Sequence, residues 1–175
     1  MGDQAGGARL RQLARDPAAT LVVIGCLSLA AGALVYLTDR SAAHTLLLPA
    51  MAPLSDRPLF GILGHWLPSF VHALAFSLFS AALLAPRLRW QYGACAFWFA
   101  VNAAFEIGQH PQVRGPLTDA LGQLPGPAPV TRALERYFLR GTFDPGDLAA
   151  AALGAALAAT ILYRLRPHPE KHHAP

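Results

Sequence analysis

Four long apolar segments constrain the fold of this chain more than any other feature of its sequence. Each is long enough, or nearly so, to cross a hydrocarbon layer of about 30 Å as a helix. A soluble helical bundle would carry a charged face on every helix, and these segments have none. The chain of 175 residues, 54% hydrophobic and 14% charged, is therefore predicted to be all-α, a polytopic transmembrane bundle of about four helices. The expected spans are residues 20–37, 70–86, 90–108 and 147–165.

The distribution of basic residues predicts the orientation of this bundle. Arginines and a lysine cluster before the first span, between the second and third, and after the fourth. The two outer loops are longer and have a lower density of basic residues, so the positive-inside rule places both termini in the cytoplasm. We therefore expect a multi-pass membrane protein. Residues 1–19 form a cytoplasmic lead, residues 20–165 the transmembrane domain and residues 166–175 a disordered cytoplasmic tail.

Other interpretations of the composition are weaker. The first apolar segment is long for a secretory signal and ends in YLTDR without a clean small-x-small cleavage site, so an uncleaved span is expected. The net charge of +4 does not indicate a nucleic-acid partner, because no basic stripe is interleaved with aromatic residues. The two cysteines, Cys26 and Cys95, fall inside spans and are expected to be free packing residues.

Both outer loops contain apolar sequence that is too interrupted to span the membrane. In the first loop, prolines limit residues 59–67 to a short interfacial or re-entrant segment, with Trp66 at headgroup depth. The second loop begins with irregular, proline-rich chain. It continues with VTRALERYFLR, whose apolar residues recur with helical spacing, and this pattern predicts an amphipathic helix lying on the outer leaflet.

Polar residues far apart in the sequence are expected to meet at the outer end of the bundle. They are His72 on the second span, Asn102, Glu106 and Gln109 on one face of the third, and Asp144 and Asp147 at the start of the fourth. Ionisable residues are costly within spans and usually face the bundle interior. The pattern predicts a polar pocket that opens outward, with Arg114 and Arg140 at its rim.

Each of these residues alone also has a purely structural explanation. His72 could be a packed histidine, Glu106 a helix-end carboxylate among headgroups, and Asp147 an N-terminal residue favoured by the helix dipole. Their common depth favours a site instead. In such a site His72 and Glu106 are the candidate proton-transfer pair, with Gln109 as a hydrogen-bonding positioner. The two aspartates would then hold a cationic group or Arg140.

Three sequence segments carry a resemblance to a known family. LPSFVHALAFSLF, FEIGQH and RGTFDPGDLAAAALGA occur in the order and spacing of the VanZ-like family of small bacterial membrane proteins, which the chain resembles over about residues 67–157. The family has a histidine at the start of one helix, E-x-x-Q at the end of the next and an R-x-x-D-x-x-D-type element at the start of the last. The matching residues are His72, Glu106, Gln109, Asp144, Asp147 and Gly154.

The resemblance has departures as well as matches. Arg140 is displaced by one residue, the family's asparagine after the second aspartate is Ala151 here, and the charged pair often preceding the histidine is Pro68–Ser69. The resemblance implies a location in the bacterial cytoplasmic (inner) membrane and a role in the cell envelope linked to glycopeptide-antibiotic (teicoplanin) resistance. It implies no particular reaction.

Three functions fit these observations. The first is recognition of an envelope or lipid-linked ligand in the outward pocket. The second is an enzyme acting on a lipid headgroup or isoprenoid-linked precursor, with a divalent ion held by carboxylates, although no ligand spacing is diagnostic of a metal. In the third, the cluster only fastens the helices of a structural or assembly subunit. The expected partners are membrane lipids and a lipid-linked envelope precursor, without a cofactor or metal, and an oligomer is compatible with the sequence.

Overall fold

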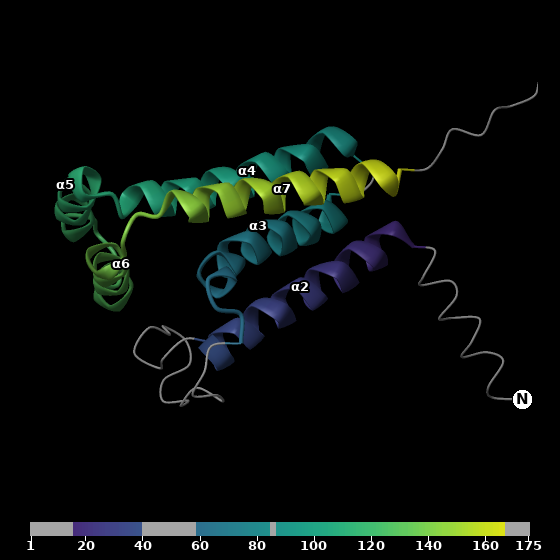
Figure 1. Ribbon diagram of the computed structural model, residues 1–175. Coiled ribbons are helices and arrows are strands. Elements are labelled where there is room, and N and C mark those ends of the chain that lie inside the picture. Colours follow the sequence, from purple (N-terminus) through teal and green to yellow (C-terminus); the bar gives the residue numbers. More distant parts are fainter. Residues whose placement is uncertain (1–15, 40–58, 85–86, 167–175) are drawn as a thin grey trace, which may run out of the picture.

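The structure is a computed structural model that describes residues 16–39, 59–84 and 87–166. Within these ranges it contains six α-helices and no strand, which confirms the all-α class. The helices are α2 (Pro17–Asp39), α3 (Leu63–Leu83), α4 (Leu88–Gly108), α5 (Pro111–Gly122), α6 (Ala128–Arg140) and α7 (Pro145–Arg164). Four long helices lie side by side, and the shorter α5 and α6 lie together at one end of them (Figure 1).

Three of the described helices, α2, α3 and α7, are long and apolar enough to cross a membrane. These lengths and compositions are those of a membrane protein. Helix α4 has the same length as α3, 21 residues, but it is less apolar because it carries Gln91, Asn102 and Glu106. It packs against both α3 and α7 along the bundle (Figure 1).

Small residues set the distance between α3 and its two apolar neighbours. On α2, a Cβ added at Gly25 would lie 2.5 Å from Phe79 Cε1, and one at Gly32 would lie 2.6 Å from Val71 Cγ2, so both glycines allow α3 to pack closely. On α7, a Cβ at Gly154 would lie only 2.3 Å from the backbone oxygen of Phe70. The backbones of α3 and α7 therefore touch, as small-residue stripes allow in membrane helices.

The end of the bundle opposite α5 and α6 combines an apolar core with an aromatic and basic boundary. The core residues are Leu21, Leu74, Leu78, Ala81, Cys95, Ala158 and Leu162. Beyond them, the guanidinium of Arg166 lies 5.1 Å from the ring of Tyr92 and 5.0 Å from that of Tyr163. Aromatic rings beside arginines are typical of a membrane–water boundary.

The outer loops differ from the expectations in two places. Residues 63–67 are not a separate interfacial segment, because α3 begins at Leu63 and continues through the buried Pro68 to Leu83, not over 70–86. Membrane helices accept proline because packing with neighbouring helices compensates for the missing backbone hydrogen bond. The second loop begins with α5, where Pro111 in the first turn is a favourable residue, and the expected proline-rich irregular chain follows this helix over residues 123–127.

The amphipathic helix expected in the second loop is present as α6. The fourth helix also extends slightly further outward than expected, since Asp144 is the N-cap residue of α7. Both cysteines are free, as expected, but only Cys95 is buried, whereas Cys26 is exposed. The expected lead and tail, 1–19 and 166–175, lie mostly outside the described residues.

Candidate functional site

The last turn of α4 buries two polar side chains. Glu106 is 8% exposed and Gln109 is 7% exposed. A carboxylate oxygen of Glu106 accepts a hydrogen bond from the backbone N–H of Asp144, the N-cap residue of α7. Because a buried carboxylate is costly unless it is hydrogen-bonded, this contact fixes the end of α4 to the start of α7.

Asp144 uses both of its carboxylate oxygens. Oδ1 accepts from the backbone N–H of Gly146 at 2.8 Å, which is the usual N-cap contact. Oδ2 accepts from the indole N–H of Trp66 on α3 at 2.9 Å. The indole can come this close only because residue 146 is glycine, since an added Cβ would lie 2.2 Å from Trp66 Nε1.

Asp147 makes the equivalent contact one turn further along. Its Oδ1 accepts from the hydroxyl of Ser69 on α3 at 2.6 Å. Both donor–acceptor pairs are 78 residues apart in sequence, which is the register of two helices that run in the same direction. The first turn of a helix also favours a carboxylate through the helix dipole. The two aspartates therefore join α7 to α3, as Glu106 joins it to α4.

The three carboxylates form one acidic cluster with a shared field. Asp144 and Asp147 are both near enough to Glu106 to act on it electrostatically. We use the name acidic cluster for Glu106, Asp144 and Asp147. In the part of the chain that the structure describes, no three His, Cys, Asp or Glu side chains are arranged to hold a metal ion.

Helix α6 covers the end of α4 beside this cluster. Phe138 is buried and stacks on Phe105 with ring centroids 5.7 Å apart, in space left by Gly108. Its neighbour Tyr137 is hydrogen-bonded to the side chain of Gln109 and lies within the field of Glu106. Phe138 therefore anchors α6, and Tyr137 connects the α6 surface to the buried end of α4.

Burial and the negative charge of Glu106 raise the pKa of Tyr137. Because the folded pKa lies above the unfolded value of about 10, the stabilising contribution of protonated Tyr137 is complete below about pH 10 and is lost as the pH rises through the folded pKa. Replacing Tyr137 by phenylalanine should make the alkaline fall in melting temperature of the purified protein shallower. Tyr163→Phe, at the opposite end, is the control; equal slopes in all three proteins would contradict the expectation.

A groove of about 460 Å³ runs along α6 to Tyr137. Its lining is almost wholly apolar: Phe105, Pro129, Val130, Ala133, Leu134 and Tyr137. We call it the apolar groove. Tyr137 belongs to both the apolar groove and the polar end of α4, so an apolar binding surface and buried polar groups meet at one side chain.

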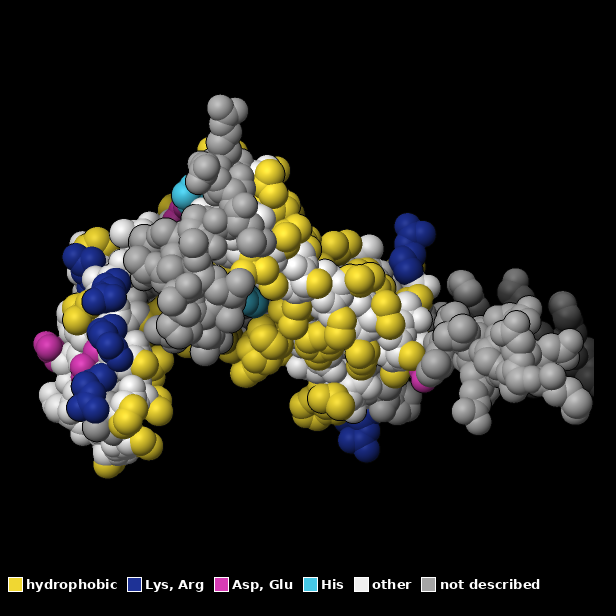
Figure 2. Space-filling model, turned by 90° about the horizontal axis from the view of Figure 1, so that it is seen from below, with side chains coloured by type: hydrophobic (Ala, Val, Ile, Leu, Met, Phe, Trp, Pro, Cys, Tyr) yellow, Lys and Arg dark blue, Asp and Glu magenta, His cyan; other side chains and the backbone are white. Residues whose placement is uncertain are grey.

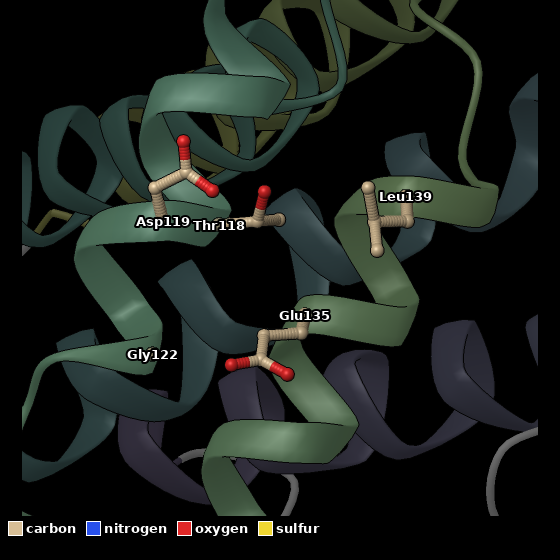
Figure 3. Close-up of a pocket in the computed structure, with 5 residues that line it drawn as sticks. All are labelled: Thr118, Asp119, Gly122, Glu135 and Leu139. Atoms are coloured by element: carbon tan, nitrogen blue, oxygen red, sulfur yellow. The ribbon is translucent and has the colours of Figure 1, made fainter.

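A second hollow, of about 380 Å³, lies between α5 and α6 (Figure 3). It is lined by Thr118, Asp119, Gly122, Glu135 and Leu139. Glu135 reaches from α6 toward α5, where a Cβ on Gly122 would lie 3.3 Å from Glu135 Oε1. This hollow is away from the acidic cluster and shares no lining residue with the apolar groove.

The structure brings together only some of the residues predicted from sequence. Glu106, Asp144 and Asp147 meet, and Gln109 lies beside them. His72 is half-buried on α3 and stacks on Phe76 with centroids 5.9 Å apart. Among the contacts of the described residues, none joins His72 to Glu106.

The remaining predicted residues are Asn102 on α4, Arg140 on α6 and Arg114 on α5. Asn102 Nδ2 donates to the backbone oxygen of Trp98, one turn earlier in its own helix, at 2.8 Å. Arg140 is exposed in the last turn of α6, and Arg114 is half-buried on α5.

Trp66, Ser69 and Tyr137 are the partners that sequence reasoning missed. Trp66 and Ser69 are three positions apart in sequence, as Asp144 and Asp147 are. This matched spacing is the sequence signal that could have identified them as hydrogen-bonding partners of the two aspartates. Comparison with known proteins adds no relative, since no family model, curated protein or solved structure matches the chain.

Proposed function

We propose that this chain is a VanZ-like, multi-pass protein of the bacterial cytoplasmic membrane that recognises a lipid-linked ligand of the cell envelope. The observation that carries the proposal is the junction at Tyr137 between the apolar groove and the buried polar end of α4. A concave, mainly apolar surface with a few convergent polar groups is the usual form of a small-molecule site. An amphiphile fits this junction, with its chain in the groove and its polar end near Tyr137.

The proposal includes four membrane spans, with α4 as the third. The polar side chains of α4 have partners inside the bundle, which lowers the cost of placing them in lipid. Gln91 Nε2 donates to Ala81 O at 2.9 Å, and Trp98 Nε1 donates to Ser80 Oγ at 2.8 Å. Helices α5 and α6 then lie in the outer leaflet, and the boundary around Arg166 lies on the cytoplasmic side.

Filling the apolar groove tests the proposal directly. Ala133→Trp places an indole in the groove, whereas Ala156→Trp adds the same bulk to an exposed position on α7. Displacing the equivalent of two buried methylenes weakens binding about tenfold. We expect lipid that co-purifies with the protein, measured by mass spectrometry after extraction, to fall for Ala133→Trp and not for Ala156→Trp. Equal lipid content in both variants would contradict the proposal.

A structural or assembly role is the second candidate, favoured by the hydrogen bonds of the acidic cluster. Each carboxylate already accepts a bond that fastens one helix to another. Under this alternative the cluster maintains geometry and binds nothing. Substitutions that remove a hydrogen-bond acceptor of the cluster would lower the abundance and the activity of the protein together.

A membrane enzyme acting on a lipid headgroup is a further hypothesis. Its test is turnover of labelled envelope lipids by the purified protein, with and without a chelator.

A further inference from the structure

We infer that the ligand of the apolar groove is a lipid with a phosphate headgroup, bound by a row of arginines beside the groove. This inference rests on the proposed function and specifies the ligand class. The row consists of Arg132, Arg136 and Arg140, and we call it the arginine row. All three side chains are exposed.

The arginine row is parallel to the groove because both follow the helix repeat. Pro129, Ala133 and Tyr137 line the groove at i, i+4 and i+8. The arginines come three residues after them, one each, and residues three apart are neighbours on a helix surface. Figure 2 shows basic side chains in a row over this end of the molecule, with hydrophobic side chains beside them toward the bundle.

Charge decides which headgroup fits. Like charges at i and i+4 repel each other, and here Arg136 Nε donates to the backbone oxygen of Arg132 at 3.1 Å. A bound phosphate would relieve that repulsion. Guanidinium groups also match phosphate geometry with paired hydrogen bonds.

The acidic cluster lies near the other side of Tyr137, toward the buried end of α4. Its negative charges repel a phosphate there and confine the anion to the arginine row.

The position of α6 selects a lipid as the source of the phosphate. The row extends over about 12 Å, eight residues at 1.5 Å each. Helix α6 carries the apolar groove beside the arginine row. Its exposed apolar residues include Val130, which is 55% exposed. A basic amphipathic helix of this kind lies at the headgroup level of a membrane. A free phosphate would use the arginines alone and leave the groove empty.

The test uses the full-length protein in neutral detergent and native mass spectrometry. The probes are phosphatidic acid, diacylglycerol with the same acyl chains, and inorganic phosphate. We compare the wild type with the double variant Arg136→Gln/Arg140→Gln, with Arg136→Lys, and with the groove variant Ala133→Trp. Arg164→Gln in the last turn of α7 controls for the loss of a positive charge at the other end of the bundle.

We expect phosphatidic acid to bind more tightly than diacylglycerol, and the double variant to weaken phosphatidic acid about tenfold or more without affecting diacylglycerol. Arg136→Lys keeps the charge without the planar fork and should lie between wild type and the double variant. Arg164→Gln should bind like the wild type.

Other outcomes separate this inference from the proposed function. If Ala133→Trp weakens both lipids while the arginine variants change neither, the groove binds lipid but the phosphate inference is overturned. If inorganic phosphate binds as tightly as phosphatidic acid and is unaffected by Ala133→Trp, the row is a simple anion site and the inference is overturned as well. If no variant changes any binding, both proposals fail.

Discussion

Replacing Gly154 by alanine is expected to destabilise the bundle, although alanine is the better helix former. The intrinsic preference favours alanine by about 1 kcal/mol. The new Cβ, however, would lie 2.3 Å from Phe70 O and 3.2 Å from Leu74 N. Both are backbone atoms of α3 and cannot rotate away. The helices must separate, and overpacking of this kind costs about 1–3 kcal/mol.

The melting temperature of the purified protein in detergent measures this effect. A loss of 1 kcal/mol lowers the melting temperature of a chain of this size by about 2–4 °C. The matched control is Gly93→Ala in α4, where an added Cβ has no neighbour within 4 Å among the described residues, so only the helix preference acts. The two alanines should therefore shift the melting temperature in opposite directions. An increase for Gly154→Ala would show that the α3–α7 contact is not as close as described.

Sequence reasoning predicted the elements that follow from periodicity and apolar length. The four long segments and the amphipathic α6 are local patterns. Pro68 is a position where the local pattern misled. Proline usually ends a helix, yet Pro68 lies inside α3. Tertiary packing overrides such preferences, and no single-sequence pattern records it.

In the candidate site, too, local sequence patterns predicted some features and tertiary packing determined the others. Helix direction and depth were enough to bring Glu106 near the two aspartates. The register between α3 and α7 could not be predicted from the sequence, because it depends on how closely the two helices approach each other. That distance is set by Gly146 and Gly154, and it turns Trp66 and Ser69 toward the aspartates. His72, one turn after Ser69, lies beside Phe76.

Two substitutions of Glu106 should separate its charge from its hydrogen bond. Glu106→Gln keeps an oxygen that can accept from Asp144 N–H, so the fastening of α4 to α7 survives. Glu106→Ala removes the acceptor and leaves that N–H without its partner, at a cost of about 1–3 kcal/mol. We therefore expect a wild-type melting temperature for the glutamine variant and a lower one for the alanine variant. Glu135→Gln, in the second hollow, controls for the loss of one carboxylate.

The phenotype of bacteria that produce the same variants distinguishes ligand recognition from a purely structural role of Glu106. The readout is glycopeptide tolerance of a bacterial host that produces each variant, normalised to the amount of protein in the membrane. If the carboxylate takes part in recognition, Glu106→Gln loses the phenotype at normal abundance, because an uncharged amide no longer repels the phosphate and so no longer confines it to the arginine row. If the cluster only fastens helices, Glu106→Gln keeps the phenotype and Glu106→Ala loses phenotype and abundance in parallel. A wild-type phenotype for Glu106→Gln would thus rule out a charged role for this residue and leave the structural explanation.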